Sequence, residues 1–279
     1  MQSKHKKALC LSALLAIVLF LLPSCIEKGS TPTYSTGKEI VCWGDSMTEG
    51  FGASVAEIAT ADGVFDASYL SYPEILEQLT GITTYNFGVP SATSEEIAIM
   101  QGGIVPIDDL SCYETINYDI MAQSKDHKGD ILILEIGSNG GWNGDYATLI
   151  AQYRAMIKYA GCDKYIIIGD TDDPENSTDD AVAQRAMELE DETVGTADTF
   201  WDTALRKEFG DHFVNMRVFL IENGLYLTGF EPTAADLEAA EHGAISVQLR
   251  SDWTHFNSYG YYAKAVGVYQ KGIQLNYWS

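Results

Sequence analysis

The chain has 279 residues, 46% of them hydrophobic and 20% charged, a composition typical of a globular protein with an ordinary core. It carries 40 acidic residues against 17 basic ones, a net charge of −23 at pH 7. So acidic a chain repels phosphate backbones and anionic lipid, which excludes nucleic acid as an expected partner. Cys42, Cys112 and Cys162 match no zinc-binding spacing, and no disulfide framework follows from them.

The first 24 residues are typical of a secretory signal. Lysines at positions 4, 6 and 7 precede an apolar run from Ala8 to Leu22, and small residues follow the run. The run has about 15 residues, fewer than the ~20 that a membrane-spanning helix needs. Removal of the three lysines leaves 14 of the 17 basic residues against 40 acidic ones, a net charge of −26.

The end of this segment, Leu22-Pro23-Ser24-Cys25, resembles the bacterial lipobox, whose cysteine is acylated and becomes the new N-terminus. We therefore expect a signal peptide over residues 1–24 and Cys25 as the lipidated residue. Residues 25–37, rich in Ser, Thr, Gly and Pro, are expected to form a flexible tether. This places the protein outside the cytoplasm, in contact with the membrane only through its lipid. The alternative is simple cleavage nearby and release of a free, secreted protein.

Strands and helices are predicted to alternate along the rest of the chain. The expected strands are Glu39–Trp43, Ile82–Phe87, Asp130–Ile136, Tyr165–Ile168 and Phe213–Met216. The expected helices are Tyr72–Leu79, Ser94–Met100, Tyr146–Tyr159, Ala197–Phe209, Ala234–His242 and Tyr259–Gln270. This alternation predicts an α/β fold in which helices cover both faces of a parallel sheet.

Two long connections fit this scheme less well, Gly50–Leu70 and Gly102–Lys128. Connections of this length are often functional lids or surfaces that contact substrate. The chain shows neither an internal repeat nor a linker to a second domain, so residues 38–279 are expected to form one domain.

Two short polar motifs bring together the parts of a covalent hydrolase. GDSMTEG at positions 44–50 follows the first strand, which places a serine on a tight turn at the edge of the sheet where ligands bind. Far downstream, DWTH at positions 252–255 supplies a carboxylate and an imidazole three residues apart. A nucleophile, a base and an orienting group are what covalent hydrolysis requires. His127, His212 and His242 are rival bases, but none lies in such a motif.

Four motifs in this order resemble the blocks of the SGNH/GDSL hydrolases, a family of esterases and lipases. They are GDSMTEG, NFGVPSAT at positions 86–93, GSNG at positions 137–140, and DWTH followed by FNSYGY. The resemblance extends from about Ile40 to about Ala265. It implies a three-layer α/β/α sandwich with a flavodoxin-like parallel sheet.

The resemblance also implies a role for each motif. Ser46 is the nucleophile, His255 its base, and Asp252 the residue that orients the imidazole. The oxyanion is bound by the backbone N–H groups of Ser46 and Ser91 and by the side-chain amide of Asn139. Ser91 stands where the family has glycine, and a backbone donor does not depend on its side chain.

The choice of backbone donor stays open, and one further position differs from the family. Gly88 remains the alternative to Ser91 as the backbone donor if the loop is shifted. Gly140 stands where the family usually has an aspartate, which removes one polar contact and leaves Asn139 intact.

The expected function is therefore that of an extracytoplasmic serine esterase. We expect it to hydrolyse short-chain acyl esters through an acyl-enzyme, with O-acetyl groups on carbohydrate as the leading substrate. A lipase or lysophospholipase is one alternative, and a non-catalytic glycan-binding protein on a hydrolase scaffold is another. This chemistry requires neither a cofactor nor a metal.

Acidic residues crowd one segment after the fourth strand, and a metal site is one interpretation of this pattern. They are Asp170, Asp172, Asp173, Glu175, Asp179 and Asp180. The spacing does not match an EF-hand, which needs Gly at position 175 and Glu at position 181. A solvated acidic loop is the preferred interpretation, and occasional calcium binding is the second.

Overall fold

The computed structural model describes residues 38–54, 57–60, 63–67, 70–172 and 195–278. Within these residues, five parallel strands form one sheet in the order β4-β1-β5-β6-β7, and a separate hairpin pairs β2 with β3. The strands are β1 (Glu39–Gly44), β2 (Glu57–Thr60), β3 (Gly63–Asp66), β4 (Thr83–Gly88), β5 (Ile131–Glu135), β6 (Tyr165–Ile168) and β7 (Phe213–Val214).

Helices connect the strands. They are α2 (Ser46–Glu49), α3 (Tyr72–Thr80), α4 (Ser94–Gln101), α5 (Tyr118–Ser124), α6 (Tyr146–Ala160), α8 (Phe200–Phe209), α9 (Met216–Thr228), α10 (Ala234–Glu241) and α11 (Ser258–Gln274). Short 3₁₀ helices occupy Leu110–Cys112, Gly210–His212 and Val247–Leu249.

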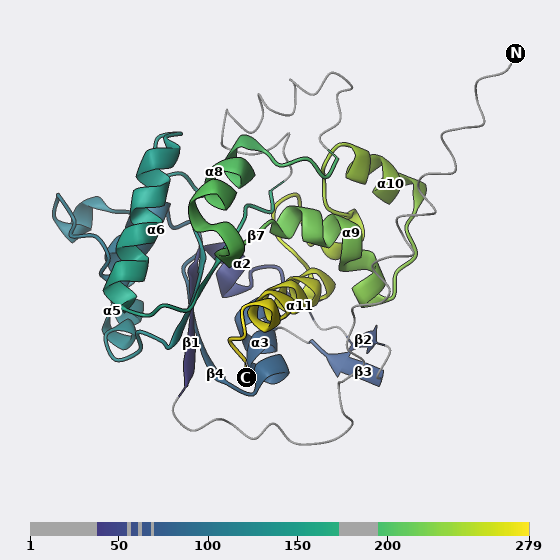
Figure 1. The fold of residues 1–279 in the computed structure, drawn as a ribbon, viewed down its shortest axis with the longest axis horizontal. Coiled ribbons are helices and arrows are strands. Elements are labelled where there is room, and N and C mark those ends of the chain that lie inside the picture. The colour runs from purple at the N-terminus through teal and green to yellow at the C-terminus, as the bar shows by residue number, and fades with distance from the viewer. Residues whose placement is uncertain (1–37, 55–56, 61–62, 68–69, 173–194, 279) are drawn as a thin grey trace, which may run out of the picture. The chain divides into compact units, whose positions relative to one another are not determined.

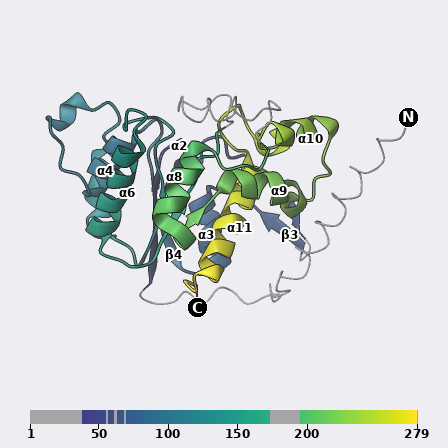
Figure 2. The same cartoon turned by 45° about the horizontal axis from the view of Figure 1, so that its top comes forward.

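Two apolar cores lie on opposite faces of the sheet, because successive side chains of a strand point to opposite sides. On one face, Ile40, Cys42 and Ile133 pack with residues of α3 and α11. On the other face, Val41 and Trp43 pack with residues of α4, α6 and α8. Figures 1 and 2 show α11 and α3 on one side of the strands and α6 on the other. The predicted three-layer α/β/α sandwich is confirmed.

The strand order determines where a ligand site is expected. Counted along the chain, the five strands follow the order 2-1-3-4-5, the flavodoxin-like arrangement that the sequence predicted. The connections leave β1 in one direction along the sheet and leave β5 in the other. Ligands of such sheets bind beyond the carboxyl ends of the two strands at this switch point. Here these ends are followed by Ser46 and by the segment with Asn139.

Local signals explain where several helices begin and end. Thr93 caps α4 in a capping box with Glu96, and Asp145 accepts hydrogen bonds from the first turn of α6. Gly102 and Gly161 end these two helices in the left-handed conformation, with φ of 98° and 70°.

The structure corrects three details of the predicted elements. The helix expected over Ala197–Phe209 begins only at Phe200, because Thr199 caps it in a capping box with Asp202. The strand expected over Phe213–Met216 ends at Val214, and Met216 begins α9, which the sequence did not predict.

The two long connections also contain regular structure. The first includes the β2–β3 hairpin, and the second includes α5. The predicted signal peptide, Cys25 and the tether over residues 25–37 lie outside the described residues and stay predictions. In the part of the chain that is described, no helix combines the length and apolarity needed to cross a bilayer.

Candidate active site

The turn after β1 holds Ser46 at the edge of the sheet. Asp45 caps α2 by accepting a hydrogen bond from Met47 N at 2.9 Å, and Ser46 is the first residue of the helix. Ser46 is partly exposed between buried Asp45 and Met47. Gly44 is required for this turn, because a Cβ there would lie 2.0 Å from Thr48 Oγ1. In the order Gly-Asp-Ser, close packing thus requires the glycine, and the aspartate caps the helix that begins at the serine.

A second segment brings an imidazole to Ser46. His255 Nε2 lies 2.9 Å from Ser46 Oγ, and His255 Nδ1 lies 2.8 Å from Asp252 Oδ2. A ring that donates from Nδ1 to the carboxylate presents Nε2 as an acceptor for the serine O–H. The structure therefore brings Ser46, His255 and Asp252 together in the arrangement of a nucleophile, base and orienting group.

The loop that carries Asp252 and His255 is stabilised largely by its own hydrogen bonds. Asp252 Oδ1 accepts from Thr254 N at 2.8 Å and from His255 N at 2.7 Å. Partial burial acts to raise the pKa of Asp252, but these bonds and the imidazole hold it below its usual value. The carboxylate is therefore ionised at neutral pH, as an orienting acceptor must be.

Two neighbouring side chains also contact this loop. Arg250 Nη1 donates to Thr254 O at 2.9 Å, and its Nη2 donates to Thr171 O at 2.9 Å, which ties the loop to the segment after β6. The Phe51 ring lies with its centroid 4.6 Å from that of the His255 imidazole. Phe51 is 52% exposed, so it forms a solvent-facing wall beside the base.

Ser91 has the backbone conformation of a glycine position. Its φ is 64°, one of three positive values among the described non-glycine residues. No partner for the Ser91 N–H is found within the described ranges. By contrast, Gly88 N donates to Asn86 Oδ1 at 2.9 Å, so this N–H is already engaged. Of the two N–H groups, that of Gly88 is thus engaged within the chain, and that of Ser91 has no partner among the described residues.

Gly88 has a different reason to be glycine. A Cβ there would lie 2.1 Å from Glu49 N, so its absence allows β4 to approach the turn that carries Ser46.

The Asn139 amide contacts the Ser46 turn. Asn139 Nδ2 donates to Asp45 Oδ2 at 3.1 Å and contacts Ala92 O at 3.3 Å. Asp45 thus links the Ser46 turn to the Asn139 loop through one carboxylate. Burial, followed by the negative charge of Glu135, raises the pKa of Asp45 to about 7. No sequence motif assigns Asp45 a role of its own, because the residue before a serine in a turn carries no separate signal for one.

The acidic segment after β6 is not simply solvated, which corrects the preferred interpretation for two of its residues. Asp172 is buried, and Asp170 is partly buried and accepts hydrogen bonds from Ser138 Oγ at 3.1 Å and from Asp172 N at 3.3 Å. Burial raises the pKa of both carboxyls, and the charge of Asp170 raises that of Asp172 further. Asp173, Glu175, Asp179 and Asp180 lie outside the described residues.

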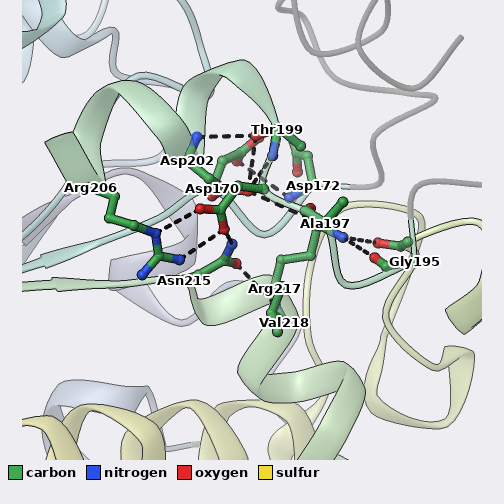
Figure 3. A network of polar contacts seen from close by, with 12 residues as sticks. Asp170, Asp172, Gly195, Ala197, Thr199, Asp202, Arg206, Asn215, Arg217 and Val218 are labelled. Carbon is green, nitrogen blue, oxygen red and sulfur yellow. Dashed lines mark hydrogen bonds and ion pairs between the residues drawn. The ribbon is translucent and has the colours of Figure 1, made fainter. Parts of the chain in front are cut away.

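A buried arginine next to this segment organises the chain before α8 (Figure 3). Arg217 donates to the carbonyl oxygens of Gly195, Ala197 and Gly243, and lies 3.5 Å from an oxygen of Asp202. Because Ser138 binds Asp170, the network in Figure 3 borders the loop that carries Asn139.

Two rival bases lie at the other end of the strands. His127 contacts Glu39, the first residue of β1, and His212 contacts the carbonyl of Tyr165, the first residue of β6. Both are therefore remote from Ser46, which follows the last residue of β1. His242 ends α10 as its C-cap. Across the described part of the chain, no group of three or more His, Cys, Asp or Glu side chains is arranged to hold a metal ion.

No model of a known protein family matches the chain, and no curated protein matches it. Similar solved structures include a protein described as a lipolytic member of the G-D-S-L family from Desulfitobacterium hafniense DCB-2. It is 15% identical, has a TM-score of 0.49, and the match covers 84% of this chain and 99% of that one. The aryl esterase of M. smegmatis is 13% identical with a TM-score of 0.43, and the match covers 85% and 99% of the two chains.

A carbohydrate esterase family 2 enzyme with a carbohydrate-binding domain, from Corynascus thermopiles (Myceliophthora fergusii), is also similar. It is 11% identical with a TM-score of 0.46, and the match covers 89% of this chain and 69% of that one. The solved structures similar to this chain thus include GDSL lipolytic enzymes and esterases, the group that the sequence motifs resemble.

Proposed function

We propose that this chain is a serine esterase of the SGNH/GDSL type, with Ser46 as nucleophile. The observation that supports this most directly is the continuous hydrogen-bonded path from Ser46 Oγ through His255 to Asp252, with distances of 2.9 and 2.8 Å. A serine hydroxyl needs a base to become a nucleophile, and the base needs a fixed orientation. Both requirements are met at the edge of the sheet where ligands bind.

The proposed reaction proceeds through an acyl-enzyme. Ser46 Oγ attacks the acyl carbon while its proton passes to His255 Nε2, and Asp252 accepts the hydrogen bond from the imidazolium. The bond to the leaving alcohol then breaks as His255 returns the proton to that oxygen. Water, deprotonated by His255, then attacks the acyl carbon. The bond from that carbon to Ser46 Oγ breaks as His255 returns the proton to Oγ, which releases the carboxylic acid and restores Ser46.

Three donors are proposed for the negative charge that develops on the acyl oxygen. They are the N–H groups of Ser46 and Ser91 and the amide of Asn139. One N–H of Asn139 stays on Asp45, which fixes the plane of the amide. The other makes only a long 3.3 Å contact with Ala92 O, so this is the N–H that is proposed to be shared with the oxyanion.

The proposed substrates are short-chain acyl esters, with O-acetyl groups on carbohydrate as the leading class. The support comes from the N-terminal segment, because a secreted or surface-anchored esterase meets glycans more readily than intracellular thioesters. A lipase or lysophospholipase is the alternative, and it requires an extended apolar site for the acyl chain.

Turnover of two nitrophenyl esters tests the reaction and the acyl preference together. The wild-type chain is expected to cleave nitrophenyl acetate faster than nitrophenyl octanoate, and Ser46→Ala is expected to lower turnover about 10⁴-fold or more. Ser111→Ala, at an exposed serine of a 3₁₀ helix, is the matched control and is expected to be fully active. Full activity of Ser46→Ala contradicts the assignment. A preference for octanoate favours the lipase, and no turnover by wild type favours the glycan-binding protein.

We also propose that Cys25 carries a lipid that anchors the protein outside the cytoplasm. The experiment is fractionation of cells that express the wild type or Cys25→Ala. The wild type is expected in the membrane fraction and the variant in the soluble fraction. Equal distribution of the two contradicts the anchor and leaves a secreted protein.

A further inference from the structure

An ion pair is buried directly beneath the proposed active site. Lys264 Nζ lies 2.6 Å from both carboxylate oxygens of Glu135. Lys264 is 0% exposed and Glu135 4% exposed. Removing two charges from water is costly, and a well-packed apolar pair of similar volume is often equally stable or more stable. The stability of the fold is therefore a weak explanation for this pair.

The two residues come from the segments that carry the proposed base and the proposed oxyanion amide. Glu135 is the last residue of β5, and the chain runs from it through Gly137 to Asn139. Lys264 lies in α11, whose N-cap, Asn257, follows His255 by two residues. The ion pair thus joins the start of the Asn139 loop to the helix that follows His255.

The turn that carries Ser46 rests on the same ion pair. Thr48, fully buried in α2, points its Oγ1 at Glu135 Oε2 at 3.5 Å. The close packing continues in the backbone, because a Cβ on Gly44 would lie 2.7 Å from Glu135 O. Glu135 therefore contacts the Ser46 turn on one side and α11 on the other.

Aromatic rings flank the ammonium group. Lys264 Nζ lies 4.9 Å from the centroid of the Tyr72 ring and 5.8 Å from that of Phe256. Both distances are within the range of a favourable cation–π contact. Phe256 directly follows His255, so the ammonium also contacts the segment that carries the base.

We propose that the Glu135–Lys264 pair is a positioning element for the ester hydrolysis proposed above: it holds the Ser46 turn, the Asn139 loop and the His255 segment in register. Neither side chain touches the reacting atoms. The pair affects the rate by fixing the positions of the catalytic groups, because a displacement of about 1 Å in an active site can lower the rate about 100-fold. This inference rests on the proposed function, since a non-catalytic protein has no such geometry to maintain.

The experiment replaces the charges and keeps the volume. The double variant Glu135→Leu/Lys264→Met is expected to fold, with a far-ultraviolet circular dichroism spectrum like that of wild type. Its kcat on nitrophenyl acetate is expected to fall about tenfold or more, with KM changed less than about threefold, because substrate contacts remain while the catalytic groups shift. A folded double variant with the kcat of wild type overturns the proposal.

Thr48→Val is a second, milder test that does not depend on the double variant. It removes the hydroxyl that contacts Glu135 and keeps the shape of the side chain, so kcat is expected to fall about threefold with KM unchanged. If the double variant fails to fold, an unchanged kcat for Thr48→Val overturns the proposal.

Two controls separate this inference from the function on which it rests. Arg154 and Glu208 form an exposed ion pair between α6 and α8, and Arg154→Met/Glu208→Leu is expected to keep the kcat of wild type. Labelling of the wild type with a serine-directed fluorophosphonate reports the function independently. If the wild type is labelled and the double variant Glu135→Leu/Lys264→Met is fully active, only the positioning role is contradicted. If the wild type is unlabelled and inactive, both proposals are contradicted.

Discussion

The two halves of the proposed triad are supported in different ways. Ser46 lies between buried residues, on a turn packed against β4 and β5 and above a buried ion pair. Asp252 and His255 lie on a surface loop, where their side chains are 41% and 19% exposed, and Asp252 itself supplies two of the hydrogen bonds that shape the loop. The proposed nucleophile thus lies on a turn packed into the core of the fold, whereas much of the support for the proposed base comes from hydrogen bonds within its own surface loop.

This difference predicts which substitutions affect activity alone and which also affect stability. Changes on the surface loop remove few buried contacts, so they are expected to lower turnover and leave the fold intact. Changes at the Ser46 turn disturb close packing, so they are expected to lower stability as well.

His255→Gln is expected to have the largest effect, and on activity only. Loss of the base lowers kcat about 10⁴-fold, about 5 kcal/mol on the barrier. Because the side chain is on the loop, the thermal midpoint is expected to stay within about 2 °C of wild type. Nitrophenyl acetate kinetics and circular dichroism melting measure the two quantities. A large drop in the thermal midpoint contradicts the expectation that substitutions on the surface loop leave the stability unchanged.

Asn139→Ala is expected to affect both quantities. Loss of an oxyanion donor lowers kcat about 10²- to 10³-fold, about 3 to 4 kcal/mol. It also leaves the Asp45 carboxylate without a partner for Oδ2, so a modest loss of stability is expected. Asn223→Ala, where the amide donates to Phe219 O within α9, is the control. Unchanged turnover for Asn139→Ala removes this residue from the proposed oxyanion site.

Gly44→Ala tests the buried half directly. The added methyl group would meet Thr48 Oγ1 and Glu135 O at 2.0 and 2.7 Å, so the free energy of unfolding is expected to fall by about 3 kcal/mol. Urea denaturation measures this loss. Turnover of the remaining folded protein is expected to fall as well, since the displaced turn carries Ser46. A variant as stable as wild type shows that the turn is not closely packed.

The pH dependence of stability is expected to show the smallest effect. The pKa values of Asp45, Asp170 and Asp172 are raised by burial from the unfolded value of about 3.9. Between about pH 4 and 8 the folded state therefore binds more protons than the unfolded state, and the stability these groups contribute is lost as the pH rises. Carboxyls with a lowered pKa, such as Asp236 at about 2, change the stability only below this pH range.

Thermal melting at pH 5 and pH 8 checks this prediction. The wild-type midpoint is expected to be higher at pH 5. Asp172→Asn removes one of the three acids with a raised pKa, so it is expected to stabilise the chain at pH 8 by about 1 to 2 kcal/mol and to reduce the difference in midpoint between the two pH values. A midpoint that is higher at pH 8 and unaffected by Asp172→Asn contradicts the account.

The sheet was predictable from sequence because its strands are short apolar runs bounded by glycine and polar residues. Ile131–Glu135 and Tyr165–Ile168 are of this kind, and both lie within or match the predicted strands. Helix α9 was missed because apolar residues occur on all its sides and Asn223-Gly224 interrupts it, so no helical stripe is visible. The β2–β3 pair was missed because Glu57–Thr60 and Gly63–Asp66 are only four residues long each and show no alternation of apolar and polar residues.

The site residues that belong to a sequence motif were predictable, and the residues outside the motifs were not. Ser46, Asp252 and His255 were found because each belongs to a short pattern with a chemical reason. Lys264 and Glu135 could not be found, because a charged residue in a helix or strand pattern is expected on the surface, and nothing local shows that the two meet. Their pairing depends on contact between segments 129 residues apart.

The most direct test of the central claim is to locate the covalent adduct of a fluorophosphonate by mass spectrometry, with wild type, Ser46→Ala and His255→Gln side by side. The account predicts one adduct, on the peptide that contains Ser46, absent in Ser46→Ala and formed far more slowly in His255→Gln. A wild-type chain that forms no adduct, or forms it on another residue, contradicts the assignment of Ser46 as the nucleophile.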